Sequence, residues 1–138
     1  MPVIYVATAV STGDGRNGHV ETSDGKVSID LAYPKEIGGA GSGSNPEQLV
    51  AMGYAACFSS ALGAVAQRRH LTLTGVEVTC NASLHRDDDA FALSFEIVAH
   101  VPGLDPEQAN SIVAEAHTVC PYSKAFGRGV DTQARATT

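Results

Sequence analysis

The alternation of apolar and polar residues predicts β-strands near both ends of the chain. Residues 27–33 alternate with the period of two that is typical of a strand, and an Asp-Gly pair at 24–25 is a hairpin turn signal. This signal pairs residues 27–33 with residues 19–23 as an antiparallel hairpin. The apolar run at residues 3–10 predicts a first strand, and residues 130–136 predict a last one.

A second hairpin is predicted in the middle of the chain. Residues 76–84 and residues 91–101 each carry apolar side chains at every second position. Three consecutive aspartates at 87–89 separate the two stretches and favour a turn. We therefore expect the two stretches to pair as antiparallel strands.

Capping signals predict two helices. Asn-Pro at 45–46 begins a helix that is expected to run to about residue 69, and Asp-Pro at 105–106 begins another that is expected to run to about residue 119. The first helix is apolar in nearly every direction, which a small chain has difficulty covering alone, so a dimer is expected. The order of strands, helix, strands, helix and strand predicts an α+β fold.

Length and charge narrow the class of protein. The chain has 138 residues, of which 43% are apolar, so a single domain over residues 1–138 is expected. Its formal net charge is −6 and it has no basic stripe, which argues against a nucleic-acid partner. The N-terminal apolar run lacks the basic leader of a signal peptide, and the longest apolar segment, residues 45–70, is interrupted by Glu47 and Gln48. A cytoplasmic protein without a membrane span is therefore predicted.

The three cysteines leave structural thiols, metal ligands and redox chemistry open. Their odd, low number argues against a secreted disulfide scaffold. Cys57 lies within the first predicted helix among apolar residues, where burial raises a thiol pKa unless a positive group is near. Cys120 follows the second predicted helix, and a helix boundary is more accessible than a helix middle. Cys80, on the apolar face of a predicted strand, is interpreted as structural.

Other residues carry weaker signals of chemistry. His70 and His117 are candidate metal ligands, but no CxxC or HExxH motif accompanies them, so no metal site is predicted. The Gly/Ser-rich run at 38–43 indicates a flexible connector, since it lacks the lysine and the spacing of a phosphate-binding loop. Taken alone, Arg16 is an exposed loop arginine and Glu47 is an acidic residue that suits the first turn of a helix.

Several segments match one known family. Asn-Pro-Glu-Gln-Leu at 45–49 is followed by Gly-Tyr-Ala-Ala-Cys-Phe at 53–58, and Val-Cys-Pro-Tyr-Ser stands at 119–123. Gly-Arg-Asn-Gly at 15–18 is a further match. With these segments the chain resembles the organic hydroperoxide resistance family, part of the osmotically-inducible-protein-C superfamily, over essentially its whole length.

The resemblance implies a fold and a reaction. The fold would be an intertwined homodimer whose antiparallel sheets wrap around a long central helix. The reaction would be that of a peroxidase, in which Cys57 attacks an organic hydroperoxide and Cys120 then resolves the oxidised cysteine as a disulfide. Arg16 would stabilise the Cys57 thiolate and orient the peroxide, and Glu47 would hold Arg16. No bound cofactor is implied, and an external dithiol, a lipoyl group on a partner protein, would regenerate the enzyme.

The spacing along the first helix adds an expectation about assembly. Ten residues separate Glu47 from Cys57, which at a helical rise of about 1.5 Å per residue places them roughly 15 Å apart. Long side chains bridge only part of that distance, so Arg16 and Glu47 are expected to serve a site that is completed across the dimer interface. The chain departs from the family at residues 124–129, and this difference is expected to affect disulfide formation and the docking of the reductant.

Three other interpretations fit the same cysteines. One is a thiol enzyme of the same superfamily with a different peroxide preference. Another is a redox-sensing or ligand-binding dimer that does not turn over, and the third is a metal-binding protein.

Overall fold

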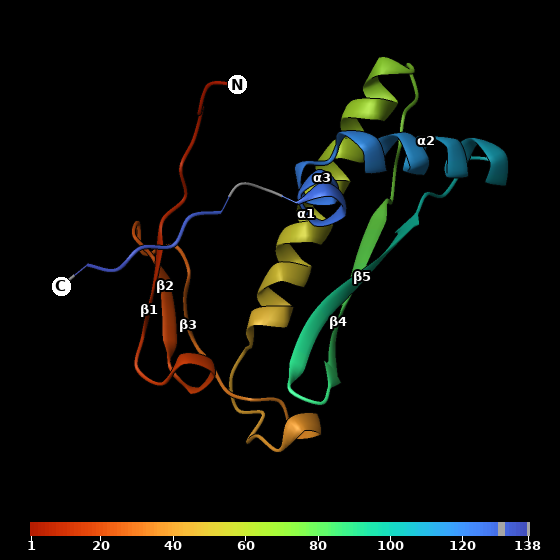
Figure 1. The fold of residues 1–138 in the computed structure, drawn as a ribbon. Helices are drawn as coiled ribbons and strands as arrows, with labels where there is room; N and C mark the ends of the chain where they lie inside the picture. The colour runs from red at the N-terminus through yellow and green to blue at the C-terminus, as the bar shows by residue number, and fades with distance from the viewer. Residues whose placement is uncertain (130–131, 138) are drawn as a thin grey trace. The chain divides into compact units, whose positions relative to one another are not determined.

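The computed structural model describes residues 1–129 and 132–137, which form two compact units, Met1–Leu49 and Val50–Thr138. Figure 1 follows the chain through them by colour. The elements are helical and antiparallel β, so the predicted α+β fold is confirmed. The single domain that the sequence suggests stays a prediction.

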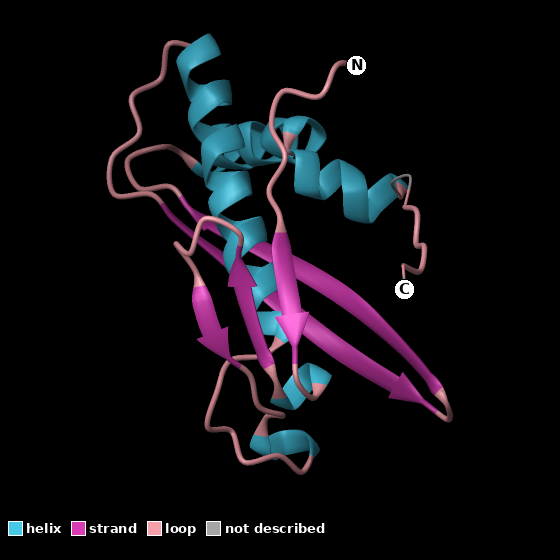
Figure 2. Cartoon of the chain, turned by 90° about the vertical axis from the view of Figure 1, so that its left-hand side faces the viewer, coloured by secondary structure: helices cyan, strands magenta, loops and turns pink. Residues whose placement is uncertain are grey.

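The first unit is built on a small antiparallel sheet. Its strands are β1 (Ala9–Thr12), β2 (His19–Thr22) and β3 (Ser28–Asp30), in the order β1-β2-β3 (Figure 2). Two short 3-10 helices accompany them, η1 (Gly15–Asn17) and η2 (Lys35–Ile37). The predicted hairpin of β2 and β3 is present, and Gly25 adopts a φ of 73° in its turn, a conformation that glycine reaches without strain.

Two predicted strands at the ends of the chain differ from the structure. The first strand begins at Ala9 rather than at residue 3, because β2 offers partners only to Ala9–Thr12. The apolar pattern of residues 3–8 therefore has no strand to pair with inside this sheet. Of the strand predicted at 130–136, residues 132–136 are not in a strand, and residues 130 and 131 lie outside the described part of the chain.

The second unit combines helices with a long hairpin (Figure 1). Its elements are α1 (Pro46–Arg68), whose first turn belongs to the first unit, β4 (Glu77–Asp87), β5 (Ala90–His100), α2 (Pro106–Val119) and α3 (Pro121–Arg128). Asp87 pairs with Ala90, so the turn between β4 and β5 has only two central residues. Asp88 sits there at a φ of 48°, which aspartate tolerates better than most residues.

Both predicted helix starts are confirmed by their caps. The Asn45 side-chain oxygen accepts a hydrogen bond of 2.9 Å from the backbone N–H of Gln48. The Asp105 carboxylate accepts one of the same length from the backbone N–H of Gln108. Each cap satisfies a donor that the first turn of a helix leaves unpaired, and loss of such a cap costs about 1 kcal/mol.

The core of the second unit lies between α1, α2 and the hairpin. Phe58, Leu62 and Val65 of α1 are buried against Ile112 and Ala116 of α2. A fully buried side chain of the size of Phe or Leu stabilises the fold by about 1.5–3 kcal/mol. This core fixes α1 and the last turn of α2, the two elements that carry the cysteines of interest.

Helix α1 also has the length and composition of a membrane span, as no other helix of residues 1–129 and 132–137 has. No membrane span was predicted, because Glu47 and Gln48 interrupt the apolar segment. In the structure both residues lie in the first turn of α1, and most of the remaining helix is apolar. Core helices of soluble proteins pass the same test, and Phe58, Leu62 and Val65 are buried within the unit.

Candidate functional site

Cys57 and Cys120 lie side by side in the second unit. Their Sγ atoms are 3.6 Å apart, so the two thiols are in contact but not bonded. Cys57 is half-buried, whereas Cys120 is fully buried with no exposed surface. The pair is therefore reachable from solvent through Cys57.

The junction of α2 and α3 places Cys120. This residue is both the last cap of α2 and the first cap of α3, with an extended backbone at φ −61° and ψ 124°. Pro121 then starts α3, where its missing N–H is no loss. The next residue, Tyr122, directs its backbone N–H to the sulfur of Cys57.

The surroundings of Cys57 favour the thiol form. Burial raises the pKa of Cys57 above the usual value for cysteine, and the neighbouring Cys120 raises it further. The N–H of Tyr122 lowers the Cys57 pKa, because a hydrogen bond favours the thiolate, but burial has the larger effect. A reactive thiolate at this position requires a positive group in addition.

Arg16 and Glu47 form a two-pronged ion pair in the first unit. The Arg16 guanidinium donates hydrogen bonds of 2.8 Å and 2.6 Å to the two carboxylate oxygens of Glu47. The pairing raises the Arg16 pKa and lowers the Glu47 pKa. Such a bidentate pair fixes the plane of the guanidinium as well as its position.

The loop between β1 and β2 presents Arg16. Gly18 ends η1 where a Cβ atom would lie 2.3 Å from the carbonyl oxygen of Thr12, so any side chain there would displace the loop. The Asn17 side chain accepts a hydrogen bond of 3.2 Å from the backbone N–H of Tyr33. The two residues that follow Arg16 are thus held by contacts with Thr12 and Tyr33.

An open groove runs beside Cys57 along α1. Its volume is about 530 Å³, and its lining residues are Cys57, Ser60, Ala61, Ala64, Gln67, Arg68, Val119 and Pro121. Most of this lining is aliphatic or small, so the groove offers space for an apolar group next to the Cys57 sulfur. Groups of this kind gain free energy by leaving water.

The structure thus groups the predicted residues in two pairs, Cys57 with Cys120 and Arg16 with Glu47. Cys80 packs partly buried against the core, and burial raises its pKa, as expected of a structural thiol. His117, considered above as a metal ligand, instead hydrogen-bonds Ser123 through Nδ1 at 3.0 Å. No group of three His, Cys, Asp or Glu side chains suited to a metal ion occurs in residues 1–129 and 132–137.

Sequence reasoning missed the helix that follows Cys120. The signal was present, because Pro121 suits the first position of a helix and Gly129 suits the residue after its end. Because α3 was not predicted, two of its contacts were also missed. These are the contact of the Tyr122 N–H with Cys57 and the hydrogen bond between Ser123 and His117.

Comparison with known proteins identifies the family of this chain. The family model described as OsmC-like protein matches residues 39–135. The organic hydroperoxide resistance protein of Xanthomonas axonopodis pv. citri is 42% identical over 131 residues, which cover 94% of this chain and 92% of the relative.

Solved structures agree with this relationship. An organic hydroperoxide resistance protein from Legionella pneumophila matches with a TM-score of 0.86 and 46% identity, over 94% of this chain and 95% of that one. The organic hydroperoxide resistance protein OhrB of Bacillus subtilis matches with a TM-score of 0.82 and 38% identity, over 94% and 96%. The chain therefore belongs to the OsmC-like family, and within it is related over nearly its whole length to the organic hydroperoxide resistance proteins.

Proposed function

We propose that this protein is a thiol peroxidase that reduces organic hydroperoxides to alcohols, with Cys57 as the attacking cysteine and Cys120 as the resolving cysteine. The relatives named for organic hydroperoxide resistance support a role in that resistance. The observation that carries the mechanism is the distance of 3.6 Å between the two Sγ atoms. A dithiol pair at this distance needs only a small movement to form a disulfide, whose sulfurs lie about 2.05 Å apart.

The first step is attack by the Cys57 thiolate on the terminal oxygen of the hydroperoxide. A sulfur–oxygen bond forms and the O–O bond breaks. The alkoxide takes up a proton from the solvent and leaves as the alcohol, and Cys57 becomes a sulfenic acid that keeps the hydroxyl of the peroxide. The Cys120 thiol then attacks the sulfenic sulfur, and the oxygen leaves as water while the disulfide forms.

Arg16 is proposed to supply the positive charge that stabilises the Cys57 thiolate. A guanidinium near the sulfur would favour the thiolate and hold the peroxide oxygen on which negative charge grows. Glu47, bonded to both arms of Arg16, would keep the guanidinium in one orientation. In the proposed homodimer, the Arg16 and Glu47 pair serves a site completed across the interface.

The apolar groove supports organic rather than hydrogen peroxide as the substrate. Each CH₂ group that leaves water gains about 0.8 kcal/mol, and hydrogen peroxide has no such group to bury. Alkyl, aryl and fatty-acid hydroperoxides all meet this requirement. The groove lining of Ala61, Ala64 and Val119 offers them an apolar surface beside the sulfur.

An external dithiol, proposed to be a lipoyl group on a partner protein, would reduce the disulfide. Cys120 has no exposed surface, whereas Cys57 is half-buried and lines the groove. We therefore expect the incoming thiolate to attack the Cys57 sulfur and to release Cys120 as the leaving thiolate. The second thiol of the same dithiol then frees Cys57. No bound cofactor takes part, and a cytoplasmic location, with its reducing thiols, suits this cycle.

The test is turnover with dihydrolipoamide as the reductant and cumene hydroperoxide or hydrogen peroxide as the oxidant. Wild type, Cys57→Ser, Cys120→Ser and Cys80→Ser would be compared. We expect faster turnover with cumene hydroperoxide, loss of activity in Cys57→Ser and arrest at the sulfenic acid in Cys120→Ser. Cys80→Ser is the matched control and should turn over normally. Activity that survives Cys57→Ser would contradict the proposal, and a single oxidation without a cycle would contradict it in favour of a redox sensor.

A further inference from the structure

A chain of hydrogen bonds lies beside the cysteine pair and has no part in the steps above. Tyr54 Oη and Ser123 Oγ are 2.9 Å apart, and Ser123 Oγ is 3.0 Å from Nδ1 of His117. Tyr54 and Ser123 are 3% and 4% exposed, whereas His117, the last residue in this series of hydrogen bonds, is exposed. Ser123 is therefore the buried centre of a polar connection between α1, α2 and α3.

The three residues stand in a regular relation to the two cysteines. Tyr54 precedes Cys57 by three residues on α1, and His117 precedes Cys120 by three residues on α2. Ser123 follows Cys120 by three residues on α3. Residues three apart on a helix are neighbours on its surface, so Tyr54 lies beside Cys57 on α1. His117 and Ser123 lie in the last turn of α2 and the first turn of α3, which flank Cys120.

The hydrogen bond between His117 and Ser123 connects two helices, α2 and α3, across the non-helical residue that separates them. At Cys120 the chain is extended, with φ −61° and ψ 124°, between the end of α2 and the start of α3. The hydrogen bond from one side of this residue to the other limits how the two helices turn about Cys120. The bond from Ser123 to Tyr54 ties the same point to the helix that carries Cys57.

We propose that Ser123 and His117 are positioning residues for the disulfide-forming step, an inference that rests on the proposed function. They hold the first turn of α3 so that the Cys120 thiol faces the sulfur of a Cys57 sulfenic acid. In that step the S–S bond forms, the S–O bond breaks, and the oxygen leaves as water with the thiol proton. Displacement of a reacting atom by about 1 Å can slow a reaction about a hundredfold, so a loosened α3 should delay resolution.

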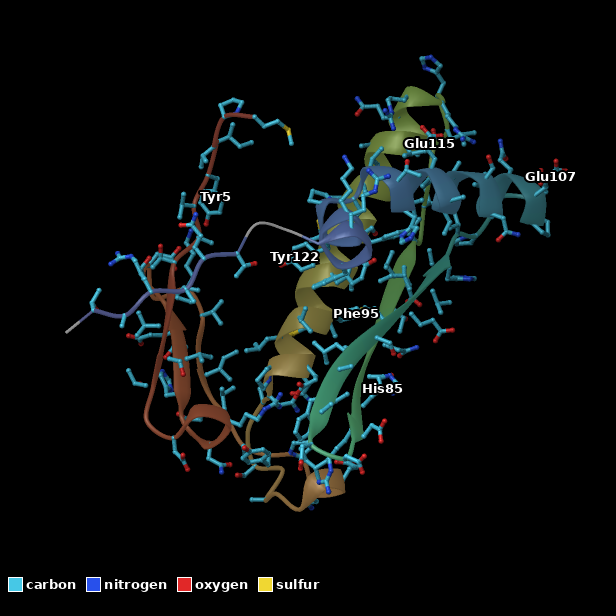
Figure 3. The ribbon with its side chains drawn as sticks, viewed as in Figure 1. Tyr5, His85, Phe95, Glu107, Glu115 and Tyr122 are labelled. Atoms are coloured by element: carbon cyan, nitrogen blue, oxygen red, sulfur yellow. The ribbon has the colours of Figure 1, made fainter. Side chains whose placement is uncertain are left out.

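The test measures the lifetime of the sulfenic acid after one equivalent of cumene hydroperoxide. Samples are quenched with a 1,3-dione trap at increasing times, and the trapped Cys57 is counted by mass spectrometry. The variants are Ser123→Ala, His117→Leu and His117→Asn, since asparagine keeps a polar atom near the place of Nδ1. His85→Leu is the matched control, because His85 also bonds a serine, Ser94 at 2.7 Å, on the hairpin (Figure 3).

We expect the lifetime to rise about tenfold to a hundredfold in Ser123→Ala and His117→Leu. The lifetime should stay within about threefold of the wild-type value in His117→Asn, and it should not change in His85→Leu. A general loss of stability would not produce this pattern. Thermal unfolding of each variant is recorded alongside, and if Ser123→Ala does not fold, the two His117 variants decide. A wild-type lifetime in His117→Leu, or an equal rise in His85→Leu, would overturn the inference. A wild type that forms no sulfenic acid and no disulfide would instead overturn the proposed function.

Discussion

At the scale of single residues, the reactivity of Cys57 depends on groups that its own helix does not provide. Burial raises the Cys57 pKa, and the backbone N–H of Tyr122 lowers it by a smaller amount. The sequence predicted the need for a positive group, because the apolar neighbours of Cys57 are visible in it. The sequence did not predict the Tyr122 contact, because that contact depends on how α3 packs against α1.

The Arg16 charge should set the pH at which Cys57 reacts. In Arg16→Met, the midpoint of the pH dependence of Cys57 alkylation should move upward by about one to two pH units, because a nearby cation favours the thiolate. Arg16→Lys keeps the charge but not the planar guanidinium, so its alkylation midpoint should fall between those of the wild type and Arg16→Met. The measurement is the rate of iodoacetamide alkylation against pH in a Cys80→Ser background. Identical midpoints in all three proteins would contradict the role of Arg16.

The Glu47 pairing should also give stability a pH dependence. The Glu47 pKa is lowered in the folded protein by its hydrogen bonds with Arg16, so the stabilisation is present above the unfolded value of about 4.3. This stabilisation is lost as the pH falls through the lower Glu47 pKa of the folded protein. We expect Glu47→Gln to reduce the free energy of unfolding by about 1–2 kcal/mol at pH 7 and by less at pH 3, which lies below the unfolded Glu47 pKa. Urea unfolding at both pH values measures this, and an equal loss at both would contradict the assignment.

At the scale of elements, patterns along the sequence predicted what local physics decides. The caps at Asn45 and Asp105 and the two hairpins are local, and the structure contains them. The predicted bounds of the first strand were wrong, because the length of a strand depends on its partner strand and not on the apolar pattern alone. Helix α3 was missed because its eight residues are few and its support is tertiary.

That tertiary support centres on Phe126 of α3. The Phe126 ring stacks on Phe95 of β5 at a centroid distance of 4.4 Å and lies 5.4 Å from the ring of Tyr54. Figure 3 shows Phe95 on the hairpin and Tyr122 on α3. Phe126 therefore supplies an aromatic contact that holds α3 against the hairpin.

Removal of this contact should loosen α3. Phe126→Ala is expected to lower the free energy of unfolding by about 1–2 kcal/mol, because the stacked pair is lost while the ring is already 46% exposed. Phe91→Ala, at a phenylalanine of the same hairpin that is 65% exposed, is the matched control and should cost less. Urea unfolding measures both. An equal loss in the two variants would show that the Phe126 stack contributes nothing specific.

At the scale of the whole molecule, the chain leaves apolar surface that a partner would cover. The N-terminal segment carries Val3, Ile4, Tyr5 and Val6, whose side chains are 70–95% exposed. Such a run in extended chain is suited to pair with a second copy, as the family resemblance implies. The sequence pointed to this dimer through the apolar helix α1, but no pattern in the sequence says which surfaces meet.

The proposed dimer predicts the mass of the protein in solution. Light scattering should give twice the mass of one chain, and the double variant Ile4→Asp with Tyr5→Asp should shift the equilibrium toward the monomer, because charges oppose burial. Lys26→Asp with Lys35→Asp, which changes charge at two residues outside this segment, serves as the control. A monomeric wild type at micromolar concentration would contradict the proposed assembly.

The central claim is that one organic hydroperoxide converts Cys57 and Cys120 into a disulfide. The most direct measurement is peptide mapping by mass spectrometry after reaction of the reduced protein with one equivalent of cumene hydroperoxide. We predict that the chain loses two hydrogen atoms, that the peptides of Cys57 and Cys120 become linked, and that Cys80 stays free. A disulfide that involves Cys80, or a Cys57 that stays oxidised without a link to Cys120, would contradict the account.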